Sequence, residues 1–465
     1  MKKTQVAIIG GGPGGYVAAI RLNQLGIESV VFEKERLGGV CLNWGCIPTK
    51  TLVKSADLFS EISRAKKFGI EIKDAKIDYE KIYKRQEKVK NRLISGVEFL
   101  FRKRKIEVIH KEAKKICFHE DNYIISTNDE EVMAQYIIIA TGSKPKTIPN
   151  INFDHKSILS SKDLLKIKEL PAKLTIIGGG VIGCEFASIY SQLGVNVEII
   201  EFLPTILNGE DEEIIKRLKI ALKKHKIKIH LNTTVNEYTT TPSGIKLKCS
   251  DNKELITDKV LISAGREPNC NLKFDNCCLD FSEKAIKINN RMETNLNNVF
   301  AIGDVTGKML LAHVASKQAI EVAKSLNNKI NSKNEVLKDI NYHNIPRCTF
   351  TNPEIASVGL TEKQAKNKYD NIKIGKFPFR ANGKALGIDE TYGFVKTVAS
   401  SSDDRLLGMH IIGPSATELI AEGTLLINNK STAKEAMETV YAHPTLSEVV
   451  AESIEDLESK AIHKI

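Results

Sequence analysis

Two stretches of the chain repeat one order of apolar, glycine and polar positions. Residues 6–33, VAIIGGGPGGYVAAIRLNQLGIESVVFE, align without a gap with residues 174–201, LTIIGGGVIGCEFASIYSQLGVNVEIIE. Each stretch starts with an apolar run, passes through a glycine cluster into apolar positions at helical spacing, and ends in a second apolar run. The pattern predicts a strand, a glycine turn, a helix of about 12 residues and a second strand, in two copies.

The glycines of each copy have the spacing GxGxxG. They are Gly10, Gly12 and Gly15 in the first copy and Gly178, Gly180 and Gly183 in the second. The first glycine permits a tight turn, the second lets the backbone approach a pyrophosphate, and the third lets the helix pack on the strand. Each copy closes with an acid, Glu33 or Glu201, suited to ribose hydroxyls. One such motif is often a structural turn, but two copies with both acids predict two dinucleotide-binding units.

The residues after Glu201 indicate which nucleotide the second unit takes. They read FLPTILNGEDEEI, and the next basic residue is Lys216. Because no cation near Glu201 would neutralise the additional phosphate of NADP, we expect NAD in the second unit.

A further apolar pattern predicts a long amphipathic helix. The positions that share its face are Ile82, Val89, Leu93, Val97 and Leu100. The densest basic run, residues 102–105, follows them. The net charge of +11 raises the question of a nucleic-acid partner. Because the basic residues are scattered and are mostly lysine, we interpret the run as a solvated helix end and expect no nucleic acid to bind.

Length and composition are typical of an enzyme of several domains. The 465 residues, 42% hydrophobic and 27% charged, suffice for about three domains. The chain contains no apolar run of the roughly 18 residues that a spanning helix needs, and its start, MKKTQVAIIGGG, does not resemble a signal peptide. We expect a cytoplasmic protein without membrane contact, whose nine cysteines are mostly reduced. Cys277 and Cys278 have no His or second CxxC nearby, so we expect no metal site.

Cys41 and Cys46 form a candidate redox pair in the segment GGVCLNWGCIPTK. In an ideal helix their Cα atoms would lie roughly 8 to 9 Å apart, beyond the about 4.4 to 6.8 Å of a disulfide. A disulfide therefore requires a distorted helix, which Gly45 makes less costly. Two unrelated buried cysteines, or half of a metal site, are the alternatives. The neighbouring dinucleotide-binding unit favours the redox pair.

Together these motifs resemble the flavin disulfide reductase family over essentially the whole chain. GGVCLNWGCIPTK is similar to its redox motif, IIIATGSKP to its second flavin motif, VFAIGDV to its ribityl-binding segment and YAHPTLSE to its catalytic signature. ISAGREPN resembles the end of its NAD domain. The closest match within the family is to members that reoxidise dihydrolipoyl groups of 2-oxo acid dehydrogenase complexes, or of glycine cleavage, and reduce NAD.

The resemblance implies an α/β fold with two Rossmann-like dinucleotide-binding domains, for FAD and NAD, and a C-terminal α+β dimerisation domain. The implied boundaries are an FAD-binding domain at 1–146, an NAD-binding domain at 147–270, a central domain that completes the FAD site at 271–340, and an interface domain at 341–465.

The resemblance also implies the roles of the reactive residues. Cys41 would exchange with the substrate dithiol, and Cys46, nearer the flavin, would be the charge-transfer thiol. His443, held by Glu448, would take the proton of the substrate, because its unperturbed pKa is near neutrality. In this family the histidine acts across a two-fold axis, which implies a homodimer. A lipoyl-bearing acyltransferase component would be the partner that brings the substrate.

The implied cofactor contacts fall in two groups. For FAD they are Gly10, Gly12, Gly15, Glu33, Lys50, Ala113, Thr141, Gly142, Asp304, Ala312 and His313. For NAD they are Gly178, Gly179, Gly180, Val181, Ile182, Gly183, Glu201, Val235 and Gly265. Lys50 and Glu185 would form a buried pair beneath the flavin.

Three positions depart from the family pattern. Val40 stands where threonine is usual, Lys111 where glycine is frequent near the adenine, and Tyr441 where the string HAHPT has its first histidine. None is among the four reactive residues, so we expect them to alter rate and potential rather than the reaction.

Other functions fit the sequence less well. An NADPH-linked reductase of glutathione or another small dithiol would have basic residues after Glu201. A mercuric reductase would have a C-terminal cysteine pair, whereas the last cysteine is Cys348. A transhydrogenase would lack Cys41 and Cys46. A catalytically silent flavoprotein need not retain both cysteines together with His443.

Overall fold

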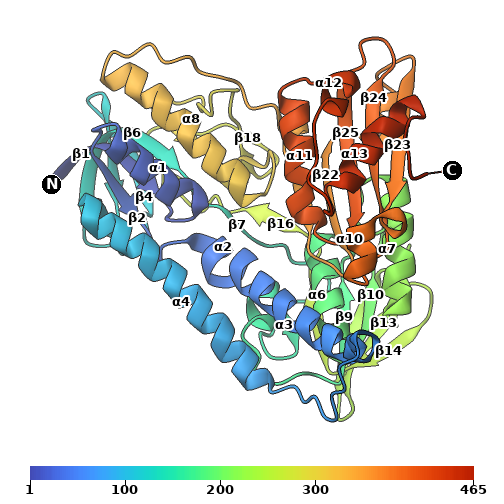
Figure 1. The fold of residues 1–465 in the computed structure, drawn as a ribbon. Helices are drawn as coiled ribbons and strands as arrows, with labels where there is room; N and C mark the ends of the chain where they lie inside the picture. The colour runs from blue at the N-terminus through green and yellow to red at the C-terminus, as the bar shows by residue number, and fades with distance from the viewer. Residues whose placement is uncertain (465) are drawn as a thin grey trace.

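The two repeated segments form equivalent strand–turn–helix–strand units in a computed structural model that describes residues 1–464 (Figure 1). In chain order they consist of β1 (Lys2–Ile9), α1 (Pro13–Gln24) and β2 (Ser29–Phe32), then β9 (Lys173–Ile177), α6 (Val181–Gln192) and β10 (Asn196–Ile200). Both strand pairs are parallel. The predicted repeat, including helices of 12 residues, is confirmed.

The first unit is part of a mixed sheet with the strand order β17-β4-β5-β6-β1-β2-β3, and β20 pairs with β6. The added strands are β3 (Glu107–Ile109), β4 (Lys115–His119), β5 (Asn122–Ser126), β6 (Glu131–Ile139), β17 (Lys273–Phe274) and β20 (Val299–Ala301). α8 (Ala312–Ile330) packs beside α1 on one face. The central strands are parallel, and their stretches 6–9, 137–139 and 299–301 are apolar and buried, as expected of strands covered on both faces. Because β17 and β20 follow the second unit in the chain, the polypeptide returns to complete the first sheet.

The predicted amphipathic helix is present as α4 (Tyr79–Arg104), but the predicted face is partly wrong. Leu93 and Leu100 are each 41% exposed. The residues that α4 buries are Tyr79, Gln86, Ile94, Val97 and Phe101. Packing against α1 and the redox segment buries Ile94 and Phe101 in place of their neighbours Leu93 and Leu100, while Val97 is buried as predicted. The basic run ends this helix, as interpreted from the sequence.

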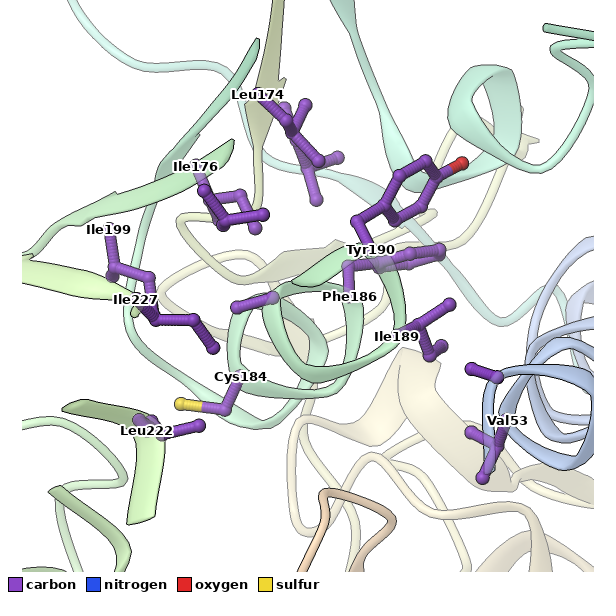
Figure 2. Close-up of a cluster of buried hydrophobic side chains, with 14 of the residues drawn as sticks. Val53, Leu174, Ile176, Cys184, Phe186, Ile189, Tyr190, Ile199, Leu222 and Ile227 are labelled. Atoms are coloured by element: carbon purple, nitrogen blue, oxygen red, sulfur yellow. The ribbon is translucent and has the colours of Figure 1, made fainter. Parts of the chain in front are cut away.

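The second unit has the strand order β11-β10-β9-β15-β8, flanked by the antiparallel sheet β12-β13-β14. The strands are β8 (Ile158–Leu159), β11 (Lys228–His230), β12 (Val235–Thr241), β13 (Gly244–Cys249), β14 (Glu254–Thr257) and β15 (Lys259–Ile262), with helices α5 (Ser161–Leu164) and α7 (Glu212–Lys224). Figure 2 shows its core, in which Ile176 and Ile199 of the sheet belong to one buried cluster with Phe186 of α6. Val53, from the redox helix of the first unit, packs into the same cluster beside Ile189. The redox helix therefore contacts both units.

Two short strands join the units. β7 (Ser143–Pro145) leads into the second unit and β16 (Arg266–Pro268) leads out of it, and the two pair in antiparallel fashion. They lie at the centre of the molecule (Figure 1).

The C-terminal part is an antiparallel sheet, β21-β22-β25-β24-β23, that packs on the second unit (Figure 1). Its strands are β21 (Arg347–Thr349), β22 (Glu354–Gly359), β23 (Ile372–Pro378), β24 (Phe394–Ser400) and β25 (Leu406–Gly413), with α11 (Ala416–Asn428), α12 (Ala433–Met437) and α13 (Glu448–Glu455) on one face. On the other face the buried Lys396 ammonium contacts carboxylates of Asp211, Glu213 and Glu362. This ion cluster ties the sheet to the start of α7, where removal of the Lys396 ammonium would leave the buried Asp211 carboxylate without its cation.

The remaining elements are short or belong to the redox segment. They are α2 (Gly39–Trp44), α3 (Cys46–Arg64), β18 (Phe281–Ser282), β19 (Ala285–Ile286), α9 (Glu362–Lys366), α10 (Gly383–Gly387) and the 3-10 helices η1 (Ala65–Phe68), η2 (Gly303–Thr306), η3 (Tyr342–Asn344), η4 (Phe379–Ala381) and η5 (Asp456–Glu458). Among residues 1–464, none of the helices has the length and apolar character needed to cross a bilayer.

Candidate active site

The first glycine turn has the shape that a pyrophosphate requires. Gly10 has φ +107°, and a Cβ at Gly15 would lie 1.8 Å from the Gly10 carbonyl oxygen. α1 starts directly after Gly12, which offers no side chain to cap the free N–H groups. The Glu33 carboxylate accepts hydrogen bonds from the N–H groups of Gly11 and Glu35, both at 2.8 Å. These features fit the adenosine diphosphate half of FAD.

The redox segment closes over this turn. Gly38 N–H donates to the Gly11 carbonyl at 2.8 Å, and a Cβ at Gly39 would lie 2.6 Å from the Gly12 Cα. Gly39 has φ +54°, which glycine adopts without strain. The chain that carries the cysteines is thereby held against the phosphate turn.

The helix that carries the cysteines is broken between them. α2 ends at Trp44, Gly45 has φ −141° and ψ −113°, and α3 begins at Cys46. The predicted distortion at Gly45 is confirmed. A larger residue would clash here, since a Cβ at Gly45 would lie 2.9 Å from the Val40 carbonyl oxygen.

The two free thiols interact directly, and the interaction shifts their pKa values in opposite directions. A hydrogen bond from Cys41, supported by the charge of Lys50, lowers the pKa of Cys46 to about 7. The bond to Cys46, together with burial, raises the pKa of Cys41. The shared hydrogen bond therefore favours the thiolate at Cys46 over a thiolate at Cys41, and a thiolate is the reactive form of cysteine.

Lys50 and Glu185 form the predicted ion pair. The Lys50 Nζ lies 2.8 Å and 2.9 Å from the two carboxylate oxygens of Glu185. Glu185 also accepts a hydrogen bond from the Phe350 N–H at 3.0 Å, and the Lys50 ammonium lies 4.4 Å from the centre of the Phe350 ring. Lys50 sits one helical turn after Cys46 on α3, so the pair links the redox helix to α6 and to Phe350, which directly follows β21.

Asp304, on η2, is held by a contact that the sequence did not predict. The Ser143 hydroxyl donates to Asp304 Oδ2 at 2.5 Å, and Arg266 donates to the Ser143 hydroxyl at 2.8 Å and to its carbonyl at 2.7 Å. Burial raises the pKa of Asp304. The available sequence signal was that Ser143 and Arg266 each follow a glycine, Gly142 or Gly265, that ends a strand-and-turn motif.

The other residues expected at FAD lie around the first sheet. Ala113 is buried in the core beneath β1 and β2. Thr141 donates its hydroxyl to the Asn269 carbonyl at 2.7 Å. Ala312 begins α8, and His313 Nε2 lies 3.0 Å from the Pro346 carbonyl, with burial lowering the pKa of its imidazole.

The second glycine turn has the same internal geometry but an open surface. A Cβ at Gly183 would lie 1.9 Å from the Gly178 carbonyl oxygen, and Glu201 accepts from the N–H groups of Gly179 at 2.6 Å and Leu203 at 2.8 Å. Gly180 has open space where Gly12 meets the redox segment. Val181 is 45% exposed. The remaining expected NAD contacts are Ile182 on α6, Val235 at the start of β12, and Gly265, with φ +100°.

His443 and Glu448 form the second reactive pair. His443 Nδ1 lies 2.8 Å from Glu448 Oε1, and the Thr445 N–H donates to Glu448 Oε2 at 2.8 Å. Burial raises the pKa of Glu448, but the hydrogen bonds from Thr445 and His443 together outweigh burial. The pKa of Glu448 is therefore below its ordinary value. The carboxylate fixes the proton on Nδ1 and leaves Nε2 as the basic atom.

One chain does not bring this pair to the cysteines. The His443 side chain is 78% exposed, and α13, which begins at Glu448, lies far from α2 in Figure 1. The cysteine pair and the His443–Glu448 pair are therefore each formed, but they lie apart within a single subunit.

The three unusual residues have local explanations. Val40 packs against the helix break at Gly45. Lys111 Nζ forms ion pairs with Asp129 and Glu130, each at 2.9 Å. Tyr441 lines a pocket beside Glu448, where burial raises the pKa of its phenol to about 12. Among residues 1–464, no group of three or more His, Cys, Asp or Glu side chains is arranged to hold a metal ion.

Family models match most of the chain. Residues 4–319 match the model of pyridine nucleotide-disulphide oxidoreductases, and residues 345–454 match the dimerisation domain of these proteins. The α/β architecture of two dinucleotide-binding units and a C-terminal α+β domain agrees with that match.

Full-length relatives and solved structures extend the similarity. The chain is 39% identical over 478 residues to the dihydrolipoyl dehydrogenase of Bacillus subtilis, with 98% of each chain covered. It is 40% identical over 450 residues to that of Chlamydia muridarum, covering 96% of this chain and 95% of the relative. The HOCl-induced flavoprotein disulfide reductase RclA from Escherichia coli superimposes with a TM-score of 0.85 at 26% identity, covering 97% and 99%. LpdA from Mycobacterium tuberculosis, at 24% identity and a TM-score of 0.88 over 98% and 100%, shares the fold.

Proposed function

Because the chain belongs to the pyridine nucleotide-disulphide oxidoreductase family, we propose that it is a dihydrolipoyl dehydrogenase that uses FAD and NAD. The observation that carries this proposal is the helix break at Gly45, which brings Cys41 and Cys46 into contact beside the first nucleotide turn. The overall reaction converts a dihydrolipoyl dithiol and NAD⁺ to a lipoyl disulfide, NADH and a proton.

The cysteines carry out the exchange with substrate. A substrate thiolate attacks Cys41 of the oxidised pair, the Cys41–Cys46 bond breaks, and the departing sulfur is Cys46. The second substrate sulfur then displaces Cys41, which forms the lipoyl disulfide and leaves two enzyme thiols. Lys50 stabilises the negative charge on Cys46 when it departs, and once Cys41 is released as a thiol its hydrogen bond adds to that stabilisation. Bound FAD supplies the two-electron transfer between this dithiol and NAD.

His443 is the proposed base for the substrate thiol. Its Nε2 is free to take a proton while Glu448 holds Nδ1. Because His443 and Cys41 lie far apart within one chain, we propose that the active enzyme is a homodimer. Each subunit then supplies its histidine to the active site of the other. The dimerisation-domain match over residues 345–454 supports this arrangement.

The residue assignments belong to the same proposal. The first turn, with Glu33, Thr141, Gly142 and Asp304, would bind FAD, and the second, with Glu201, would bind NAD. The boundaries at 146 and 270 are supported by the linkers β7 and β16 and by the return of β17 and β20 to the first sheet, and the boundary at 340 by the separate sheet that begins with β21. The proposed partner is a lipoyl-bearing acyltransferase component, and the proposed location is the cytoplasm, where thiols stay reduced.

Steady-state kinetics test the function. Purified protein loaded with FAD should form NADH from dihydrolipoamide and NAD, with at least about 100-fold lower kcat/KM for NADP. Cys278→Ser, which replaces an exposed cysteine far from the pair in sequence, serves as the control and should keep full activity. Rapid NADPH-dependent reduction of another disulfide, without dihydrolipoamide oxidation, would overturn the proposal.

A further inference from the structure

Three polar side chains form a chain across the ribbon that joins the two nucleotide units. Arg266, on β16, donates to the hydroxyl and to the carbonyl of Ser143, on β7, and that hydroxyl donates to Asp304. Ser143 is only 7% exposed. The reaction described above makes no use of Ser143 or Arg266, although both are on the strands that join the two nucleotide units, β7 and β16 (Figure 1).

The direction of these hydrogen bonds is determined by the chemistry of the groups. A guanidinium can only donate, so the Ser143 oxygen must accept from Arg266 Nε. The hydroxyl has one proton, which is then available for Asp304 Oδ2 at 2.5 Å. Arg266 thus sets the hydroxyl so that one oxygen of Asp304 is occupied and the carboxylate is oriented, with its other oxygen left for a ligand.

The opposite face of the same ribbon has a different character. Lys144 and Glu267 alternate with Ser143 and Arg266 along the two strands and form an ion pair at 3.2 Å, in which the Lys144 side chain is 51% exposed. This pair lies on the solvent side and offers a control within the ribbon.

We infer that Arg266 is a positioning residue for FAD, acting through the Ser143 hydroxyl on the carboxylate of Asp304. The inference rests on the FAD binding of the proposed function. It makes the exit strand of the second unit part of the flavin site of the first. Loss of the guanidinium frees the hydroxyl to rotate and lets Asp304 turn away from the position that binds the ribityl hydroxyls.

The test measures FAD affinity rather than turnover. Apoprotein of each variant is titrated with FAD, and binding is followed by flavin fluorescence. Arg266→Met and Ser143→Ala should each weaken FAD binding about tenfold, the size expected when a charge-assisted or buried hydrogen bond is lost. Ser143→Thr, which keeps the hydroxyl, should bind within about threefold of the unchanged protein, and so should Lys144→Met. The double variant Ser143→Ala/Arg266→Met should lose no more FAD affinity than Arg266→Met alone, because both changes act on Asp304.

Other results would overturn the inference. FAD affinity unchanged in Arg266→Met would show that Asp304 needs no help from this residue. Equal weakening in Ser143→Thr and Ser143→Ala would assign the effect to packing, as would a matching loss of Tm in the apoprotein variants. The proposed function fails separately, if the unchanged protein binds FAD but does not oxidise dihydrolipoamide.

Discussion

The two nucleotide units have nearly identical turns and very different surroundings. In both, the third glycine lies against the carbonyl of the first, and the closing acid accepts two backbone N–H groups. The first turn is covered by Gly38 and Gly39 of the redox segment, whereas Gly180 of the second has open space and Phe202, which follows the closing Glu201, is 65% exposed. The same glycine turn can therefore bind a nucleotide permanently when a neighbouring segment covers it, or reversibly when it is open to solvent.

The largest effects should come from adding a methyl group at the third glycine of either turn. Gly15→Ala and Gly183→Ala each place a methyl group within 2 Å of a carbonyl oxygen, at 1.8 Å and 1.9 Å. Gly15→Ala should yield protein without flavin. Gly183→Ala should keep its flavin absorbance and raise KM for NAD at least about 100-fold. Loss of flavin from Gly183→Ala would contradict the assignment of the two sites.

The cysteines next to the covered turn should be equally indispensable. Cys41→Ser and Cys46→Ser should each lower kcat with dihydrolipoamide at least about 1,000-fold, because serine cannot form the disulfide. Flavin content should stay unchanged, which absorbance spectra of the purified variants measure. Substantial activity in either variant would place the disulfide elsewhere.

His443→Gln should lower kcat with dihydrolipoamide by about 100-fold or more, the usual contribution of a positioned base. Reduction of an artificial electron acceptor by NADH should be unaffected, since that reaction needs no substrate thiol. Glu448→Gln should have a smaller effect, about tenfold, because it leaves the imidazole in place. A loss of both activities in His443→Gln would indicate a structural role instead.

Lys50→Met should move the ionisation of Cys46 in the reduced protein to higher pH. The cation lowers the pKa of that thiol, which is about 7 in the unchanged protein, so its removal favours the protonated form. The rate of alkylation by iodoacetamide, measured against pH, reports the thiolate fraction. A profile that stayed in place or moved to lower pH would show that Lys50 does not act on Cys46.

The smallest change concerns the closing acids. Glu201→Gln should narrow the preference for NAD over NADP by about tenfold, because it removes the charge that repels the extra phosphate. Glu33→Gln should leave that ratio unchanged while weakening FAD retention. The ratio of kcat/KM values with the two nucleotides decides between these outcomes.

The sequence predicted features that depend on local spacing. The repeat followed from the glycines, and the break at Gly45 followed from the distance a disulfide can span. The face of α4 was partly wrong, because spacing alone could not distinguish Leu93 and Leu100 from Ile94 and Phe101 as the side chains that meet α1. The Ser143–Arg266 contact was missed because it joins residues 123 positions apart (266 − 143) through a ribbon with no apolar pattern. The resemblance implied that His443 acts across a two-fold axis, and within one chain the structure places His443 apart from Cys41.

The most direct test is anaerobic reduction of the purified flavoprotein by dihydrolipoamide, followed by addition of NAD and, separately, NADP. We expect a long-wavelength absorbance from the Cys46 thiolate on reduction, then stoichiometric NADH after NAD and little NADPH after NADP, with flavin still bound after gel filtration. Absence of reduction by dihydrolipoamide, with rapid reduction by NADPH, would contradict this expectation.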